Sequence, residues 1–214
     1  MSPRVTLAVT VRVLRQLRRD PRTLAMLLVL PCLLMALLSW MFPEPVFDAI
    51  GPALLAVFPV IVMFLVTSVT TLRERSSGTL ERLLAMPMGR LDFLLGYALA
   101  FGLVALLQAV LAVALSVGLL GLDVAGHTWV LTLVAIVDAV LGTALGLFVS
   151  AFARTEFQAV QFLPAVIVPQ ILLCGLLVPR DALPSVLHVV SDCLPLSYAV
   201  DAMQAVALGS GGSS

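Results

Sequence analysis

The densest group of charged residues in this chain lies at positions 73–92, between two long apolar segments. Arginine and acidic side chains are mixed there with leucines and small polar residues. Charges of both signs on a short polar segment are suited to ion pairing with another molecule. We therefore expect residues 73–92 to be presented to a partner in the aqueous phase.

Residues 77–86 have the pattern of a short helix with one apolar face. Gly78 breaks the preceding helix, and Ser77 or Thr79 can cap a new one. Pro87 ends it, because the residue before a proline is pushed out of the helical region. The apolar face consists of leucines at i, i+3 and i+4, namely Leu80, Leu83 and Leu84. Such a helix either docks into a groove on a partner or rests its leucines in lipid, and the residues favour neither.

A second group of residues with chemical potential lies inside the apolar segments. Asp138 is near the middle of one of them, where a carboxylate costs about 2.5–3.5 kcal/mol on insertion scales. It is either a site for substrate or protons, or a buried helix contact that is protonated or hydrogen-bonded. We favour the contact, because no Arg or Lys lies in an apolar segment to pair with it. Gln108 is less costly to bury and is expected to hydrogen-bond between helices.

The composition is that of an integral membrane protein. Of the 214 residues 61% are hydrophobic and 11% charged, with a mean hydropathy of +1.14, whereas soluble domains are about a quarter charged. The three cysteines lack metal-ligand spacing. H-E-x-x-H, G-x-S-x-G and a Gly-rich phosphate loop are absent. We expect no metal site, no catalysis (ATP hydrolysis included) and no nucleic-acid partner.

The apolar segments predict the fold class, an all-α polytopic membrane helix bundle. Five of them reach the length of about 20 residues that a helix needs to cross a bilayer: 23–42, 50–72, 93–121, 128–152 and 157–178. Two shorter apolar pieces at 182–208, separated at Leu194-Pro195, are expected to form helices on the outer leaflet. Residues 1–208 are predicted to form one domain, and 209–214 a flexible tail.

The arginines are concentrated in alternate connections, which predicts the orientation. Six precede the first span, four lie in 73–92 and Arg154 is in the fourth connection, whereas the first and third connections have none. After the fifth span Arg180 stands among three aspartates. By the positive-inside rule, the N-terminus and residues 73–92 are cytoplasmic.

The N-terminal segment 4–19 has an apolar stripe at helical spacing, formed by Val5, Val9, Val13 and Leu17. Arginines lie on the opposite side. This pattern predicts an interfacial helix on the anionic cytoplasmic leaflet, although an ordinary basic flank of the first span fits equally well.

The charged segment also resembles a known family pattern, R-E-x-x-x-G-T-x-E-x-L-x-x-x-P after the second span. The matching residues are Arg73, Glu74, Gly78, Thr79, Glu81, Leu83 and Pro87. This is the signature of the type-2 ATP-binding-cassette (ABC) export permeases, and the chain is most similar to bacterial drug-resistance permeases of the daunorubicin-exporter kind. Residues 150–161 (SAFARTEFQAVQ) resemble the family's turn before the fifth span, and 194–208 (LPLSYAVDAMQAVAL) its outer helix.

The resemblance implies that 77–86 is a coupling helix seated on a separate ATP-binding subunit, which would hold the ATP and Mg. The coupling residues would be Arg73, Glu74, Arg75, Gly78, Thr79, Leu80, Glu81, Arg82, Leu84 and Pro87. A second permease chain, identical or different, would complete the path. The implied activity is export of a hydrophobic drug, lipid or glycoconjugate across a bacterial cell membrane.

One departure from the family leaves an alternative open. The family's sixth span is not found in these residues. The chain is then alternatively a non-transporting membrane scaffold or a truncated, inactive permease fragment.

Overall fold

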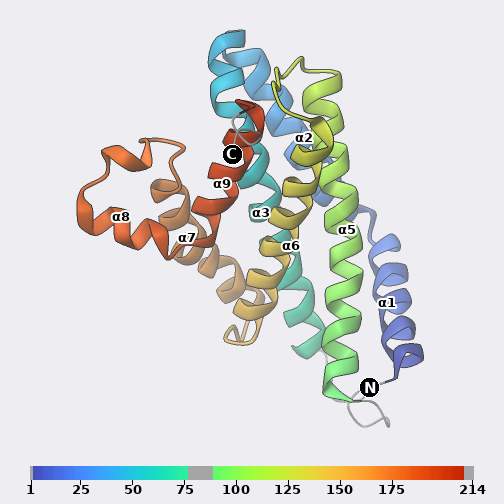
Figure 1. Cartoon of the computed structure of the whole chain (residues 1–214). Coiled ribbons are helices and arrows are strands. Elements are labelled where there is room, and N and C mark those ends of the chain that lie inside the picture. The colour runs from blue at the N-terminus through green and yellow to red at the C-terminus, as the bar shows by residue number, and fades with distance from the viewer. Residues whose placement is uncertain (1, 77–88, 210–214) are drawn as a thin grey trace.

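The computed structural model describes residues 2–76 and 89–209, and the predicted coupling helix at 77–86 lies outside them. The described chain is helical (Figure 1), and its elements in order are α1 (Pro3–Arg18), α2 (Pro21–Met41), α3 (Glu44–Ser76), α5 (Arg90–Gly118), α6 (Thr128–Ser150), α7 (Glu156–Leu173), the 3-10 turn η1 (Arg180–Ala182), α8 (Ser185–Asp192) and α9 (Pro195–Ala207). The all-α prediction is confirmed.

Five of these helices, α2, α3, α5, α6 and α7, are long and apolar enough to cross a membrane. Their number and order agree with the predicted spans. The helix α3 is longer than expected, because it runs from Glu44 to Ser76 and keeps Pro52 and Pro59 inside it. The helix α7 is shorter and ends at Leu173, just before Gly175 adopts a φ of +94° that favours glycine.

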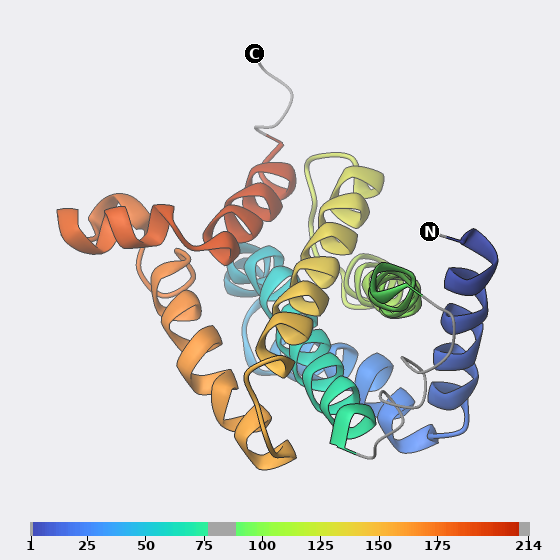
Figure 2. The same cartoon turned by 90° about the horizontal axis from the view of Figure 1, so that it is seen from below.

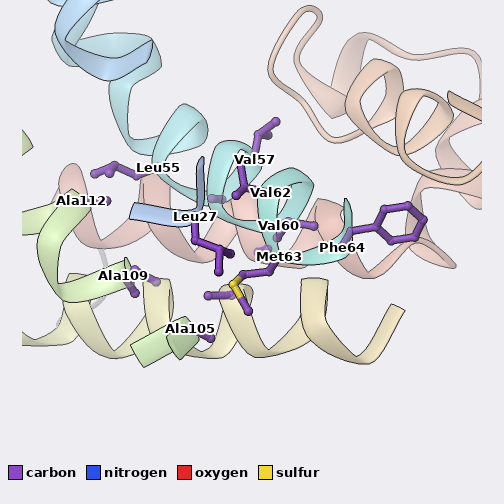
Figure 3. Packing of buried hydrophobic residues seen from close by; sticks show 14 of the residues in the cluster. Leu27, Leu55, Val57, Val60, Val62, Met63, Phe64, Ala105, Ala109 and Ala112 are labelled. Carbon is purple, nitrogen blue, oxygen red and sulfur yellow. The ribbon is translucent and has the colours of Figure 1, made fainter. Parts of the chain in front are cut away.

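The helix α3 forms the centre of the bundle. It packs against α2, α6, α7 and α9, as the views in Figures 1 and 2 agree. Within its most apolar window 72% of the residues are buried, against 17% in α7, so α3 is surrounded by protein and α7 is peripheral. Figure 3 shows Met63 of α3 in the core near Leu27 of α2 and Ala105 of α5, whereas the Phe64 ring points away from these two residues.

Two glycines allow α6 to approach α3 closely. A Cβ atom on Gly142 would lie 2.6 Å from the carbonyl oxygen of Val60, and one on Gly146 would lie 2.6 Å from that of Phe64. Close approach through small residues is typical of membrane helix pairs. The α3–α6 contact therefore fixes the position of α6 in the bundle.

The N-terminal helix α1 lies beside α5 (Figure 2). Of its predicted stripe, Val9, Val13 and Leu17 are buried, and a Cβ on Gly96 of α5 would meet Val9 at 2.6 Å. The apolar face of α1 is thus covered by protein, which leaves little of it for lipid. The helix α2 has proline as its first residue and Asp20 as its N-cap, whose carboxylate accepts a hydrogen bond from the Thr23 amide at 3.2 Å.

Of the last two helices, α9 packs on the bundle, whereas α8 projects to one side and contacts α7 and α9 (Figures 1 and 2). The helix α9 begins at Pro195, as the sequence break predicts, and packs along α3 and α6 (Figure 1). Its end meets the α5–α6 connection, where the Ala125 amide donates to the Ala207 carbonyl at 2.8 Å. Packing of α9 on α6 creates the groove described below.

Candidate functional site

The structure describes the two ends of the charged segment, which together we call the stem: the last turn of α3 (73–76), and Gly89 with the first residues of α5 (90–92). At the end of α3, the Arg73 guanidinium donates to both carboxylate oxygens of Glu156 in α7, at 3.0 and 3.1 Å. Both side chains are about half exposed (60% and 47%). The pair ties the stem to the start of α7.

Arg75 binds the α6–α7 turn. Its guanidinium donates to the carbonyls of Ser150, Ala151 and Ala153 at 2.8, 3.1 and 3.3 Å. The last carbonyls of a helix have no partner within the helix, and an arginine nearby can supply one. Arg75 therefore caps the C-terminus of α6 from a neighbouring helix.

The helix α1 contacts both sides of the stem. Arg12 donates to Glu74, which is only 5% exposed, at 3.4 Å. On the α5 side, Asp92 accepts from the Ser2 amide at 3.0 Å and from the Thr6 hydroxyl at 3.3 Å. A movement of either end of the stem would therefore be transmitted to α1 through these contacts.

The structure places three of the predicted coupling residues, Arg73, Glu74 and Arg75, at the base of the charged segment, each bound within the chain. Their contact with another subunit stays a prediction. The others lie outside the described residues: Gly78, Thr79, Leu80, Glu81, Arg82, Leu84 and Pro87. Sequence reasoning missed Arg12 and Glu156 as partners, because no local pattern joins residues 62 and 83 positions apart.

A cavity of about 280 Å³ lies beside the stem. It is lined by apolar side chains of α1, α2, α3 and α5 and also by Asp20, Arg73 and Glu74. The Thr23 hydroxyl and amide donate to Asp20 and hold the pKa of that carboxyl below its ordinary value, so it is ionised near neutral pH. A lining that combines apolar and charged side chains suits an amphipathic molecule.

The polar residues Gln108 in α5 and Asp138 in α6 lie inside membrane-spanning helices. The two helices run antiparallel, and the two residues lie equally far from the ends that adjoin the α5–α6 connection. Gln108 is ten residues from the end of α5 at Gly118, and Asp138 is ten residues from the start of α6 at Thr128. Asp138 is 3% exposed and Gln108 1%. Among the described residues neither amide atom of Gln108 nor the Oδ2 atom of Asp138 has a hydrogen-bond partner. The interhelical bond expected of Gln108 is thus not seen in that part of the chain.

A third polar cluster joins the last elements of the chain. Arg180 of η1 pairs with Asp192 at the end of α8 and Asp201 of α9, and it donates to the Ser191 hydroxyl at 3.0 Å. Its guanidinium also lies 5.6 Å from the centre of the Tyr198 ring. One arginine thereby fastens η1, α8 and α9 together.

Comparison with known proteins gives this arrangement a family. The family model of the ABC-2 type transporter matches residues 4–208. The probable multidrug ABC transporter permease YbhS of Escherichia coli is 27% identical over 158 residues, which cover 73% of this chain and 42% of that protein. The inner membrane transport permease YhhJ of the same species is 28% identical over 141 residues, covering 65% and 38%.

The similarity extends to eukaryotic proteins. ABC transporter G family member 20 of Dictyostelium discoideum is 28% identical over 163 residues, covering 75% of this chain and 22% of that protein. The chain spans less than half the length of these relatives. No solved structure matches it significantly. Since the family model covers nearly all of the sequence, the chain is a multi-pass membrane protein of the ABC-2 type transporter family.

Proposed function

We propose that this chain is the permease subunit of an ABC exporter that moves a hydrophobic drug, lipid or glycoconjugate out of the cytoplasm. The match to the ABC-2 family over residues 4–208 carries the proposal. Family membership implies association with an ABC ATP-binding subunit, and two relatives have names that describe multidrug permeases. A separate ATPase would supply the energy by docking on residues 73–92, and a second permease chain would complete the path.

The contacts of the stem support this mode of coupling. The helix α3 runs without a break from Glu44 to Ser76, so a force applied at its charged end acts on the whole length of the helix. Arg73 and Arg75 connect that end to α7 and to the α6–α7 turn, and Glu74 connects it to α1. A rigid displacement of the charged segment would therefore move α1, α3 and α7 together.

The distribution of charge supports an orientation. The end of the bundle with the stem carries Arg73, Arg75 and Arg154, and α1 adds more arginines. At the other end, the start of α3 carries Glu44 and Asp48 and the α5–α6 connection carries Asp123, and neither place has an arginine. Under the positive-inside rule the stem and the N-terminus face the cytoplasm of a bacterial cell, and the chain lies in the inner membrane.

The test is a double variant, Glu74→Ala with Glu81→Ala, in the complex with the ATP-binding subunit that we expect to co-purify with the chain. Loss of both carboxylates is expected to abolish stimulation of ATP hydrolysis by transported compounds, while membrane insertion stays intact. Stimulated ATPase activity in proteoliposomes is the measurement. Unchanged stimulation would remove these carboxylates from the coupling mechanism.

Two controls separate coupling from stability. Glu44→Ala with Asp123→Ala removes the same charge at the other end of the bundle and should leave stimulation unchanged. Arg12→Ala breaks the pair of Glu74 within the chain but leaves the carboxylate in place. If Arg12→Ala alone reproduces the loss, Glu74 acts by holding α1.

The same preparation tests the alternative of a non-transporting scaffold or inactive fragment, which the short coverage of the relatives keeps open. A scaffold would bind the ATPase without any stimulation by transported compounds. A working permease shows both.

A further inference from the structure

A groove of about 390 Å³ runs between α6 and α9, within the size range of sites for small molecules. Its α6 wall is made of large apolar side chains, Leu133, Val134, Val137 and Leu141. Its α9 wall is made mostly of small residues, Pro195, Ala199 and Ala202, with Tyr198 beside them. The small residues leave the hollow, because they do not fill the space that opens between the two helices.

Among the residues that the structure describes, Asp138 is the only one with a charged side chain that lines this groove. Asp138 is only 3% exposed, and its Oδ2 atom has no hydrogen-bond partner among the described residues. A buried carboxylate without a partner is strongly unfavourable, and such groups in membrane helices commonly mark functional positions. The groove therefore combines apolar walls with one acidic group whose partner the described chain does not supply.

The depth of Asp138 limits what that partner is. Ten residues separate it from the start of α6, which is about 15 Å at 1.5 Å per residue, near the middle of a hydrocarbon core of about 30 Å. The headgroup amine of a membrane lipid stays at the surface and would not reach this level. A compact apolar molecule with its own positive charge would.

The surroundings of the groove favour a positive charge as well. Tyr198 lines both the groove and a second hollow, which Asp181, Asp192 and Asp201 also line. The groups that face those three aspartates there are Arg180, which pairs with Asp192 and Asp201, and His188, whose Nδ1 atom lies 3.3 Å from Asp192. Carboxylates thus follow one another from the groove to the neighbouring hollow, an arrangement that attracts cations.

We propose that the α6–α9 groove binds hydrophobic amines, with their ammonium group on the carboxylate of Asp138 and their apolar body against Val137 and Ala202. Both the charge and the apolar walls are used by such a ligand, and an ammonium donates the hydrogen bonds that Asp138 lacks. That these amines are transported rests on the proposed function; that they bind does not.

The test is equilibrium binding of a dansyl fluorophore with a pentyl ammonium tail to the purified chain in lipid nanodiscs, without ATP or an ATPase. A matched dansyl compound with a hydroxyl in place of the ammonium is the neutral probe. The variant Asp138→Asn keeps the shape and removes the charge, and it is expected to weaken binding of the amine by about tenfold or more with little effect on the neutral probe. Asp138→Glu should retain amine binding.

Ala202→Phe tests the groove from the other helix. This substitution should weaken the binding of both probes, because the phenyl ring fills the space beside Asp138. Equal affinity of the amine for the original chain and Asp138→Asn would overturn the proposal, as would unchanged binding of both probes to Ala202→Phe. Cooperative thermal unfolding of each variant confirms that it is folded. If Asp138→Asn does not fold, Ala202→Phe still tests the proposal.

The amine bound in the groove has two possible sources, a mobile ligand and the headgroup of a lipid. Nanodiscs with and without phosphatidylethanolamine distinguish them. Equal binding in both supports a mobile ligand, whereas binding only in its absence would show that the lipid amine occupies the groove and would overturn the assignment. Because no ATPase is present, a failure of the coupling test leaves this result unaffected. Loss of amine binding, in turn, does not touch the coupling role of residues 73–92.

Discussion

The stem and the α6–α9 groove each contain a buried acidic side chain, and the two are treated in opposite ways. Glu74 is 5% exposed, and its Oε1 atom pairs with the guanidinium of Arg12 at 3.4 Å. Asp138 is 3% exposed, and its Oδ2 atom has no partner in the part of the chain that the structure describes. Equal burial thus accompanies a carboxylate that is paired with an arginine at the end of the bundle and one that has no such pair, among the described residues, near its middle.

The difference follows from where arginine can be placed. At the ends of the helices its long side chain reaches both water and a neighbouring helix, so α1 and α3 can exchange charged contacts. Deep in the bundle a second charge would have to be desolvated too, and the apolar sequence around Asp138 provides none. In the stem charges hold helices together, whereas in the groove a carboxylate is kept at the expense of stability.

The largest expected effect that separates these regions comes from Asp138→Leu. Replacing a buried polar group that has no partner by an apolar one should stabilise the fold by about 2 kcal/mol. Reversible unfolding in mixed detergent micelles measures it. Thr143→Leu on the same helix is the control, because the Thr143 hydroxyl already donates to the Ala139 carbonyl at 3.0 Å and no similar gain is expected. Destabilisation by Asp138→Leu would show that the carboxylate contributes to folding after all.

A smaller effect of opposite sign is expected from Arg75→Ala. Three carbonyls at the end of α6 lose their donor, partly replaced by water, which should destabilise the chain by about 1–2 kcal/mol. The measurement is the same unfolding equilibrium. Arg154→Ala removes an equal charge from the adjacent turn and serves as the matched control. A variant as stable as the original chain would mean that water caps α6 equally well.

The smallest effect is expected from Arg73→Ala. Its pair with Glu156 is about half exposed on both sides, so its loss should destabilise the chain by at most about 1 kcal/mol. The effect should also shrink with added salt, which screens exposed charges. Unfolding at low and high ionic strength checks both statements, and a large, salt-independent loss would place this pair with the buried contacts.

Much of the fold could be predicted because membrane insertion leaves a strong local signal. Length and hydropathy gave the five long helices, and Leu194-Pro195 gave the start of α9. The bounds of α3 could not be predicted in this way, since Pro52 and Pro59 look like breaks in the sequence but lie inside a helix that its neighbours support on every side. Tertiary packing overrides local preference there.

The candidate site was predictable only in part. The alternation of arginine-rich and arginine-poor connections and the pattern from Arg73 to Pro87 indicated a charged segment with a partner. That Arg12 reaches Glu74, and that Arg75 caps α6, depends on helices that meet only after folding. The stripe of α1 likewise predicted an apolar face and left open whether lipid or α5 would cover it.

Five apolar helices and the distribution of positive charge can be predicted from the residues alone, because both reflect the transfer of each segment between water and lipid, and the motif from Arg73 to Pro87 indicates the family. Which buried acid is paired depends on how the helices pack. Glu74 has arginines on both sides in the sequence, but those bind other groups, and the packing of α1 brings it Arg12. The small residues of α9 leave a hollow beside Asp138. Distance between helices, which no local pattern encodes, makes that difference.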